Sequence, residues 1–108
     1  GTIGEVSALG NLAAGTHTLD FRTANNFSMT LTGNVTLANP SNISAGQSGV
    51  LFITQDSNGS RTAAFGSYWD FSDGTAPTLS TGAAAVDMIA WIARSSTKIS
   101  AQFVGNFS

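Results

Sequence analysis

The chain alternates apolar and polar residues with a period of two, a pattern that favours strands over helices. Residues 27–31 place Phe, Met and Leu between Ser and Thr, and residues 99–103 place Ile, Ala and Phe between Ser and Gln. Successive side chains of a strand point to opposite faces, so both segments are predicted to be strands with one buried face. Turn residues recur every eight to twelve residues or so, as in sandwiches and jelly rolls. We therefore predict one all-β domain over residues 1–108, of the antiparallel sandwich or jelly-roll type.

Two segments break the alternation because both of their faces are apolar. They are residues 50–53 (VLFI) and residues 86–93 (VDMIAWIA). A strand that is apolar on both faces needs cover on both, and no segment has the amphipathic length for a covering helix. We predict that copies of the chain cover the second face in a homo-oligomer. The predicted interface residues are Leu51, Ile53, Ile89 and Trp91. The alternative is a tightly curled barrel whose second face is only partly exposed.

Turn signals suggest which strands are neighbours. Ser95-Ser96-Thr97 has a length suited to a hairpin, so residues 86–95 are predicted to pair antiparallel with the strand that follows. Asp56-Ser-Asn-Gly59 is predicted to form a second hairpin tip, between the strand at 50–55 and the one at 61–65. Gly33-Asn34 is predicted to form a turn or bulge between two further strands.

Composition excludes several classes of function. Charged residues make up 9% of the chain, against about 25% in a typical soluble domain. With four basic residues, the chain lacks the clustered positive charge that nucleic-acid binding requires. One histidine and no cysteine make a zinc site unexpected, and no other metal or cofactor is predicted. The longest apolar run is too short for a transmembrane helix and contains Asp87, so no membrane partner is expected.

An aromatic and charged cluster is the candidate ligand site. Its members are Arg61, Tyr68, Trp69, Asp70 and Asp73. Aromatic rings stack on the apolar face of a sugar while carboxylate and guanidinium groups bind its hydroxyls. The competing interpretation places the same aromatics in the core. A glycosidase needs two carboxylates across a cleft, for which Asp70 and Asp73 are the candidates. Turn chemistry explains these aspartates more simply, so we predict no enzymatic activity.

Several phrases of the sequence resemble a β-domain that recurs in bacteriophage virion proteins, mainly tail fibres and related appendages. The phrases are TLTGNVTLANP, AGQSGVLFITQD, GSRTAAFGSYWDF, GTAPTLST and AVDMIAWIARSSTKISAQF, within residues 27–107. The resemblance implies a homotrimeric, mostly β virion component at a fibre tip or on the capsid, neck or tail. It would be made in the bacterial cytoplasm, exposed on the particle and in contact with other virion proteins. Residues 26–108 would be the fibre-like domain, and residues 1–25 an attachment segment.

The function predicted from these features is that of a non-enzymatic structural or adhesion module of a phage particle, such as a tail fibre, head fibre or decoration protein. The adhesion version would bind a polysaccharide of the host surface. Two alternatives stay open: a free-standing carbohydrate-binding module and a polysaccharide depolymerase.

Overall fold

The computed structural model describes residues 5–107, which form an all-β fold with two sheets. The large sheet has six strands in the order β1-β3-β5-β8-β9-β7, and the small sheet has three in the order β2-β4-β6. No helix in the described part of the chain is long and apolar enough to cross a membrane. The elements are β1 (Val6–Leu12), β2 (Gly15–His17), β3 (Asn26–Leu31), β4 (Val35–Leu37), β5 (Ser48–Gln55), β6 (Ala63–Phe65), β7 (Trp69–Phe71), the 3-10 turn η1 (Ser72–Gly74), β8 (Val86–Ser95) and β9 (Lys98–Val104).

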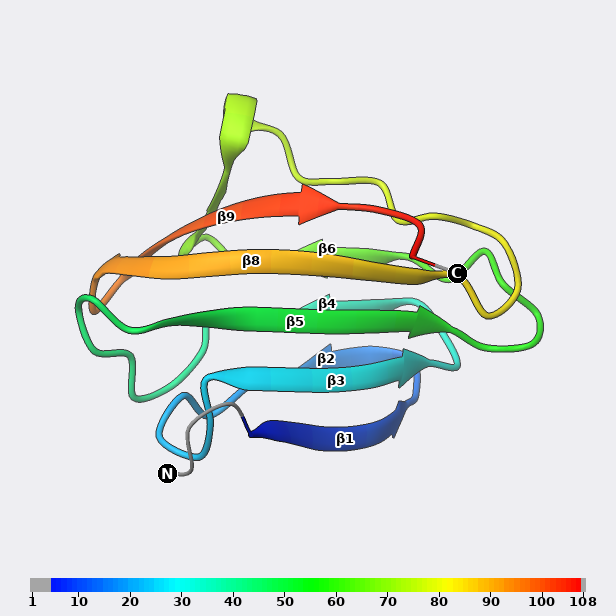
Figure 1. Cartoon of the computed structure of the whole chain (residues 1–108), viewed down its shortest axis with the longest axis horizontal. Helices are drawn as coiled ribbons and strands as arrows, with labels where there is room; N and C mark the ends of the chain where they lie inside the picture. The colour runs from blue at the N-terminus through cyan, green and yellow to red at the C-terminus, as the bar shows by residue number, and fades with distance from the viewer. Residues whose placement is uncertain (1–4, 108) are drawn as a thin grey trace.

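The first six strands form a coil that alternates between the two sheets. β1, β3 and β5 belong to the large sheet, while β2, β4 and β6 belong to the small sheet behind it (Figure 1). Each strand pairs in parallel with its equivalent in the next turn, as Phe27 does with Leu51 and Val35 with Ala63. Residues 5–65 are therefore three turns of a solenoid-like coil, in which each turn contacts its neighbours.

A hairpin completes the large sheet beyond the coil. β8 pairs antiparallel with β5 on one side and with β9 on the other. β7, which follows the last coil strand, pairs in parallel with the far side of β9. The hairpin is thus inserted between β5 and β7. As a result, β5 and β8 have a strand neighbour on both sides.

The predicted antiparallel architecture is wrong, although the all-β class is confirmed. Five of the seven strand pairings within residues 5–107 are parallel. The residues from Asp56 to Thr62 connect β5 to β6 of the other sheet, so they form a corner and not a hairpin. Gly33-Asn34 likewise leads from β3 to β4 of the opposite sheet. The predicted antiparallel pairing of β8 with β9 is confirmed.

The hydrophobic core lies between the sheets and includes all four residues predicted at the oligomer interface. Leu51 and Ile89 are 0% exposed, Ile53 is 1% and Trp91 is 3%. Trp91 also stacks on Phe21, with ring centroids 4.3 Å apart. Because these side chains contact the chain's own core, a partner cannot reach them, and the prediction is wrong for all four. The alternate positions of the same strands point outward.

The predicted attachment segment contributes two strands to the fold. β1 and β2 both lie within residues 1–25, and they pair with β3 and β4. Residues 1–4 of that segment, and Ser108 at the other end, lie outside the described residues. The described part of the segment is therefore integral to the two sheets.

Candidate functional site on the outer face of the large sheet

The outer face of the large sheet, turned away from the small sheet, carries a continuous group of apolar side chains. Cross-strand pairs place Val50 opposite Ala90, and Met88 between Phe52 and Val104. Ile92 is 49% exposed and Val104 is 40% exposed, whereas the others are half-buried. We call this group the apolar island: Val50, Phe52, Met88, Ala90, Ile92 and Val104.

Hydroxyl and amide side chains surround the apolar island on both sides. On β3, Ser28 lies opposite Phe52 of the island. On β9, Gln102 lies opposite Ala90, and Ser100 lies opposite Ile92. An apolar centre within a polar rim is the usual anatomy of a protein interface. The second apolar face predicted for residues 50–53 and 86–93 therefore exists, but it is formed by the residues that alternate with the predicted ones.

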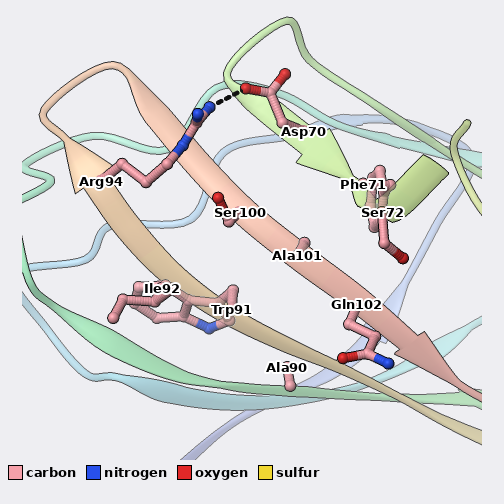
Figure 2. A pocket seen from close by; sticks show the side chains of 10 residues that line it. All are labelled: Asp70, Phe71, Ser72, Ala90, Trp91, Ile92, Arg94, Ser100, Ala101 and Gln102. Atoms are coloured by element: carbon pink, nitrogen blue, oxygen red, sulfur yellow. Dashed lines mark hydrogen bonds and ion pairs between the residues drawn. The ribbon is translucent and has the colours of Figure 1, made fainter. Parts of the chain in front are cut away.

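A shallow groove of about 540 Å³ begins where the island meets β9 and β7. Ala90 and Ile92 form its apolar side (Figure 2). Its polar lining comes from Asp70, Ser72, Arg94, Ser100 and Gln102. β8, β9 and β7 position the groups other than Ser72 side by side, because outward residues recur at every second position of each strand. Ser72 belongs to η1, which directly follows β7.

An ion pair closes one end of the groove. Arg94 donates from Nη2 to Oδ2 of Asp70 across β9, near Ser100 (Figure 2). The Arg94 side chain is 54% exposed and that of Asp70 is 45% exposed, and exposed pairs contribute little to stability. The pair instead contributes hydrogen-bonding groups to the groove. Its guanidinium and carboxylate lie beside hydroxyls and an aliphatic surface, a combination that suits a hydroxylated ligand.

The structure does not bring the five predicted ligand residues together in one site. Asp70 alone lines the groove that the ion pair closes. Trp69 is 6% exposed, and its Nε1 donates to the Ala38 carbonyl oxygen at 3.4 Å. Its ring packs edge-on against Phe65 at 5.6 Å and nearly parallel to Phe71 at 6.4 Å, and too little of it is exposed for stacking on a sugar. The core interpretation is therefore correct for Trp69.

The remaining three predicted residues have separate local roles. Arg61 pairs with Asp56 at 2.9 Å in the corner that follows β5. Tyr68 is half-buried against the core. Asp73 is exposed in η1, where its φ of 65° is the left-handed conformation that Asp tolerates in turns. Within residues 5–107, no three His, Cys, Asp or Glu side chains are grouped as metal ligands would be.

Sequence reasoning missed Arg94, Ser100 and Gln102 as groove residues. Strand parity was available as a signal, because Arg94 shares the outward parity of Ile92. The sequence did not show that β7 would lie beside β9 and bring Asp70 to Arg94.

Comparison with known proteins supplies no relative: no family model, curated protein or solved structure matches this chain.

Proposed function

We propose that this chain is a non-enzymatic structural or adhesion module of a bacteriophage particle that assembles with copies of itself through the apolar island. The observation that carries the proposal is the island itself, an apolar centre framed by the polar side chains of Ser28, Ser100 and Gln102. The resemblance to phage fibre domains adds the number of copies, which is three. In that arrangement each large sheet turns its outer face toward a common axis.

The size of the outer face supports a partner as large as another copy of the chain. Six strands spaced ~4.8 Å apart, with about seven residues rising ~3.3 Å each, span at most about 670 Å² in projection. Stable protein complexes bury roughly 800 Å² on each partner. Side-chain relief makes the accessible area larger than the projection, so an interface with other copies would use nearly the whole outer face, its polar rim included.

The charge distribution supports self-association. The apolar island contains no charged residue, and the adjacent charges of Arg94 and Asp70 compensate each other. The whole chain has a net charge of -2, so identical copies repel one another only weakly. A highly charged partner would find no complement on this face.

Mass measurement in solution by light scattering tests the proposal. Three copies of the 11.0 kDa chain give about 33 kDa, and a Met88→Asp variant is expected to run as a monomer because it places a charge in the centre of the interface. Thr16→Asp, an exposed change on β2 of the other sheet, should leave the mass unchanged. Circular dichroism confirms that each variant is folded. A monomeric wild type, or a Met88→Asp variant that assembles like the wild type, would contradict self-association through the island.

The groove supports a second candidate function, that of a free-standing carbohydrate-binding module. Its ion pair and hydroxyls beside Ile92 are suitable for sugar hydroxyls. A glycan array probed with the wild type and an Arg94→Ala variant tests this candidate. Glycan binding by the wild type that is lost in Arg94→Ala supports this candidate. Glycan binding that survives in the variant contradicts a role for the groove.

A further inference from the structure

A second cleft lies between the loops that precede β3 and β5. Both strands begin at the left end of the large sheet in Figure 1. Two loops form it, residues 18–25 before β3 and residues 38–47 before β5. They are joined by backbone hydrogen bonds, from Phe21 N to Ser41 O and from Ser41 N to Leu19 O, both 2.9 Å. The cleft measures about 480 Å³ and is separate from the apolar island.

Gln47 fixes the shape of this cleft by connecting its two loops. Its Nε2 donates to the Phe21 carbonyl oxygen at 2.7 Å and to Oδ1 of Asn25 at 2.8 Å. Its Oε1 accepts from the Ser44 backbone N–H at 3.2 Å. Both loops therefore hold their geometry without a ligand, which lowers the ordering cost of binding one.

A chain of hydrogen bonds positions the Arg22 guanidinium at the cleft. Asn42 Nδ2 donates to Asp20 Oδ1 at 2.8 Å, and Asn42 Oδ1 accepts from Arg22 Nη2 at 3.1 Å. Asn42 adopts a φ of 59°, an uncommon conformation for a residue other than glycine. Asp20 thus orients Asn42, and Asn42 orients Arg22.

Arg22 differs from the other two arginines in its ionic partners. Arg61 and Arg94 each form an ion pair with an aspartate within 4 Å, whereas Arg22 forms none among residues 5–107, although its charge acts on nearby Asp20. A guanidinium has five N–H donors, and the bond to Asn42 engages one of them. Such a group binds a carboxylate in a bidentate, charge-assisted manner.

The other residues that line the cleft indicate which class of carboxylate-bearing molecule fits it. Asn25 accepts through its Oδ1, so its amide N–H groups are directed elsewhere, and Ser44 adds a hydroxyl at the rim. Half-buried Ile43 supplies a small apolar surface. The cleft volume is within the range of roughly 300–1,000 Å³ that small-molecule sites occupy. Neutral donors of this kind match sugar hydroxyls and ring oxygens.

We infer that the cleft between residues 18–25 and 38–47 binds an acidic saccharide, with Arg22 holding the sugar carboxylate and Asn25 and Ser44 contacting its hydroxyls. This inference goes beyond self-association and does not depend on it, because the cleft residues do not belong to the apolar island. If the chain serves adhesion, this cleft gives the chemical class of its receptor.

Titration of the chain with trigalacturonate, followed by calorimetry and by amide NMR shifts, tests the inference. We expect saturable binding that weakens as salt is added, with shifts confined to the two loops. Arg22→Ala should weaken binding at least tenfold, and Arg22→Lys should retain part of it, because the charge remains while the bidentate geometry is lost. Lys98→Ala, which removes an exposed positive charge outside the lining of this cleft, is the control and should bind like the wild type.

Trigalactose, which has the same size but no carboxylate, provides the second comparison. It should bind at least tenfold more weakly than trigalacturonate. The inference is overturned if the wild type does not bind trigalacturonate, if Arg22→Ala binds it equally well, or if the neutral trisaccharide binds with the same affinity. The mass of the Arg22→Ala variant in solution distinguishes a failure of this inference from a failure of self-association, since that change should leave assembly intact.

Discussion

The Asp56 carboxylate organises the corner at which the chain leaves β5. Its Oδ1 accepts the backbone N–H groups of Asn58 and Gly59, both at 3.1 Å, and its Oδ2 pairs with Arg61 at 2.9 Å. The Arg61 guanidinium and these two N–H groups hold the pKa of Asp56 below its usual value of 3.8. Few residues of this chain are charged, and this one acts as the acceptor that stabilises a turn.

The lowered pKa of Asp56 predicts the direction of acid sensitivity. The unfolded chain binds more protons than the folded one in the acid range, so the stability from this carboxylate is complete above about pH 4 and is lost as the pH falls through the folded pKa. We expect the free energy of unfolding of an Asp56→Asn variant to fall less between pH 5 and pH 3 than that of the wild type.

Urea unfolding across that range measures the difference. Asp20 also has a lowered pKa, because of its hydrogen bonds to the Asn42 side chain and the Arg22 backbone. Some acid sensitivity therefore persists in the Asp56→Asn variant. An unchanged pH dependence would contradict the role assigned to Asp56.

At the scale of elements, one buried carboxylate of β8 holds together the segment before this strand and the segment after β9. Asp87 is 1% exposed and points to the inner side of the strand. It accepts the backbone N–H of Ser80 at 2.8 Å and that of Asn106 at 2.8 Å. One side chain therefore holds both the connection before β8 and the segment after β9.

Replacing Asp87 by alanine should destabilise the fold. The change leaves two partly buried backbone donors without their acceptor, at a cost of about 1–3 kcal/mol each. We predict a loss of about 2–6 kcal/mol in the free energy of unfolding, measured by urea titration. Asp70→Ala, on the outer face, is the control and should lose less than about 1 kcal/mol. Equal losses in the two variants would show that Asp87 does not have this connecting role.

Alternation predicted where strands lie but not which strands pair. The segments around Met29, Ile53, Ile89 and Ile99 are all strands with one buried face. The alternation of apolar and polar residues shows which residues share a face of a strand. The pattern is the same whether the neighbouring strand runs parallel or antiparallel, so it does not predict the pairing. The Ser95–Thr97 hairpin could be predicted because a short connection leaves antiparallel pairing as the only geometry. Parallel pairing leaves no such local signal.

The coil was not visible as a repeat because its turns differ in length. Val6 pairs with Asn26, 20 positions later, and Phe27 pairs with Leu51, 24 positions later. In the small sheet the second turn is longer still, with Val35 paired to Ala63, 28 positions later. Corner loops of different length remove the fixed period that repeat recognition requires.

The same limit explains the misplaced interface and ligand residues. For β8 the choice between Ile89 and Ile92 as the outward residue depends on where the small sheet lies, and residues 86–93 are apolar on both sides. Polarity does not identify the outer face of this strand, because the charged residue Asp87 faces inward. The cleft at Arg22 depends on contact between loops about 20 residues apart, which no local pattern indicates.

At the scale of the whole molecule, the two faces of the large sheet differ in how they are covered. The inner face meets the small sheet and forms the core, with Leu51 and Ile89 fully buried. The outer face has no second layer within residues 5–107, and β5 and β8 nevertheless carry apolar side chains there. Strands that are apolar on both faces are usually covered on both. In the proposed assembly other copies of the chain cover the outer face, and assembly is then coupled to folding.

That coupling predicts that thermal stability depends on protein concentration. A species that binds only the folded chain stabilises it by mass action, and in the proposed assembly that species is another folded copy. We expect the thermal midpoint of the wild type to rise by several degrees over a hundredfold increase in concentration, followed by tryptophan fluorescence. The Met88→Asp variant should melt at one temperature throughout, because it lacks the interface, and Thr16→Asp should behave like the wild type. A wild-type midpoint that is independent of concentration would mean that the apolar island remains uncovered, and that the fold is stable with one face of its large sheet in water.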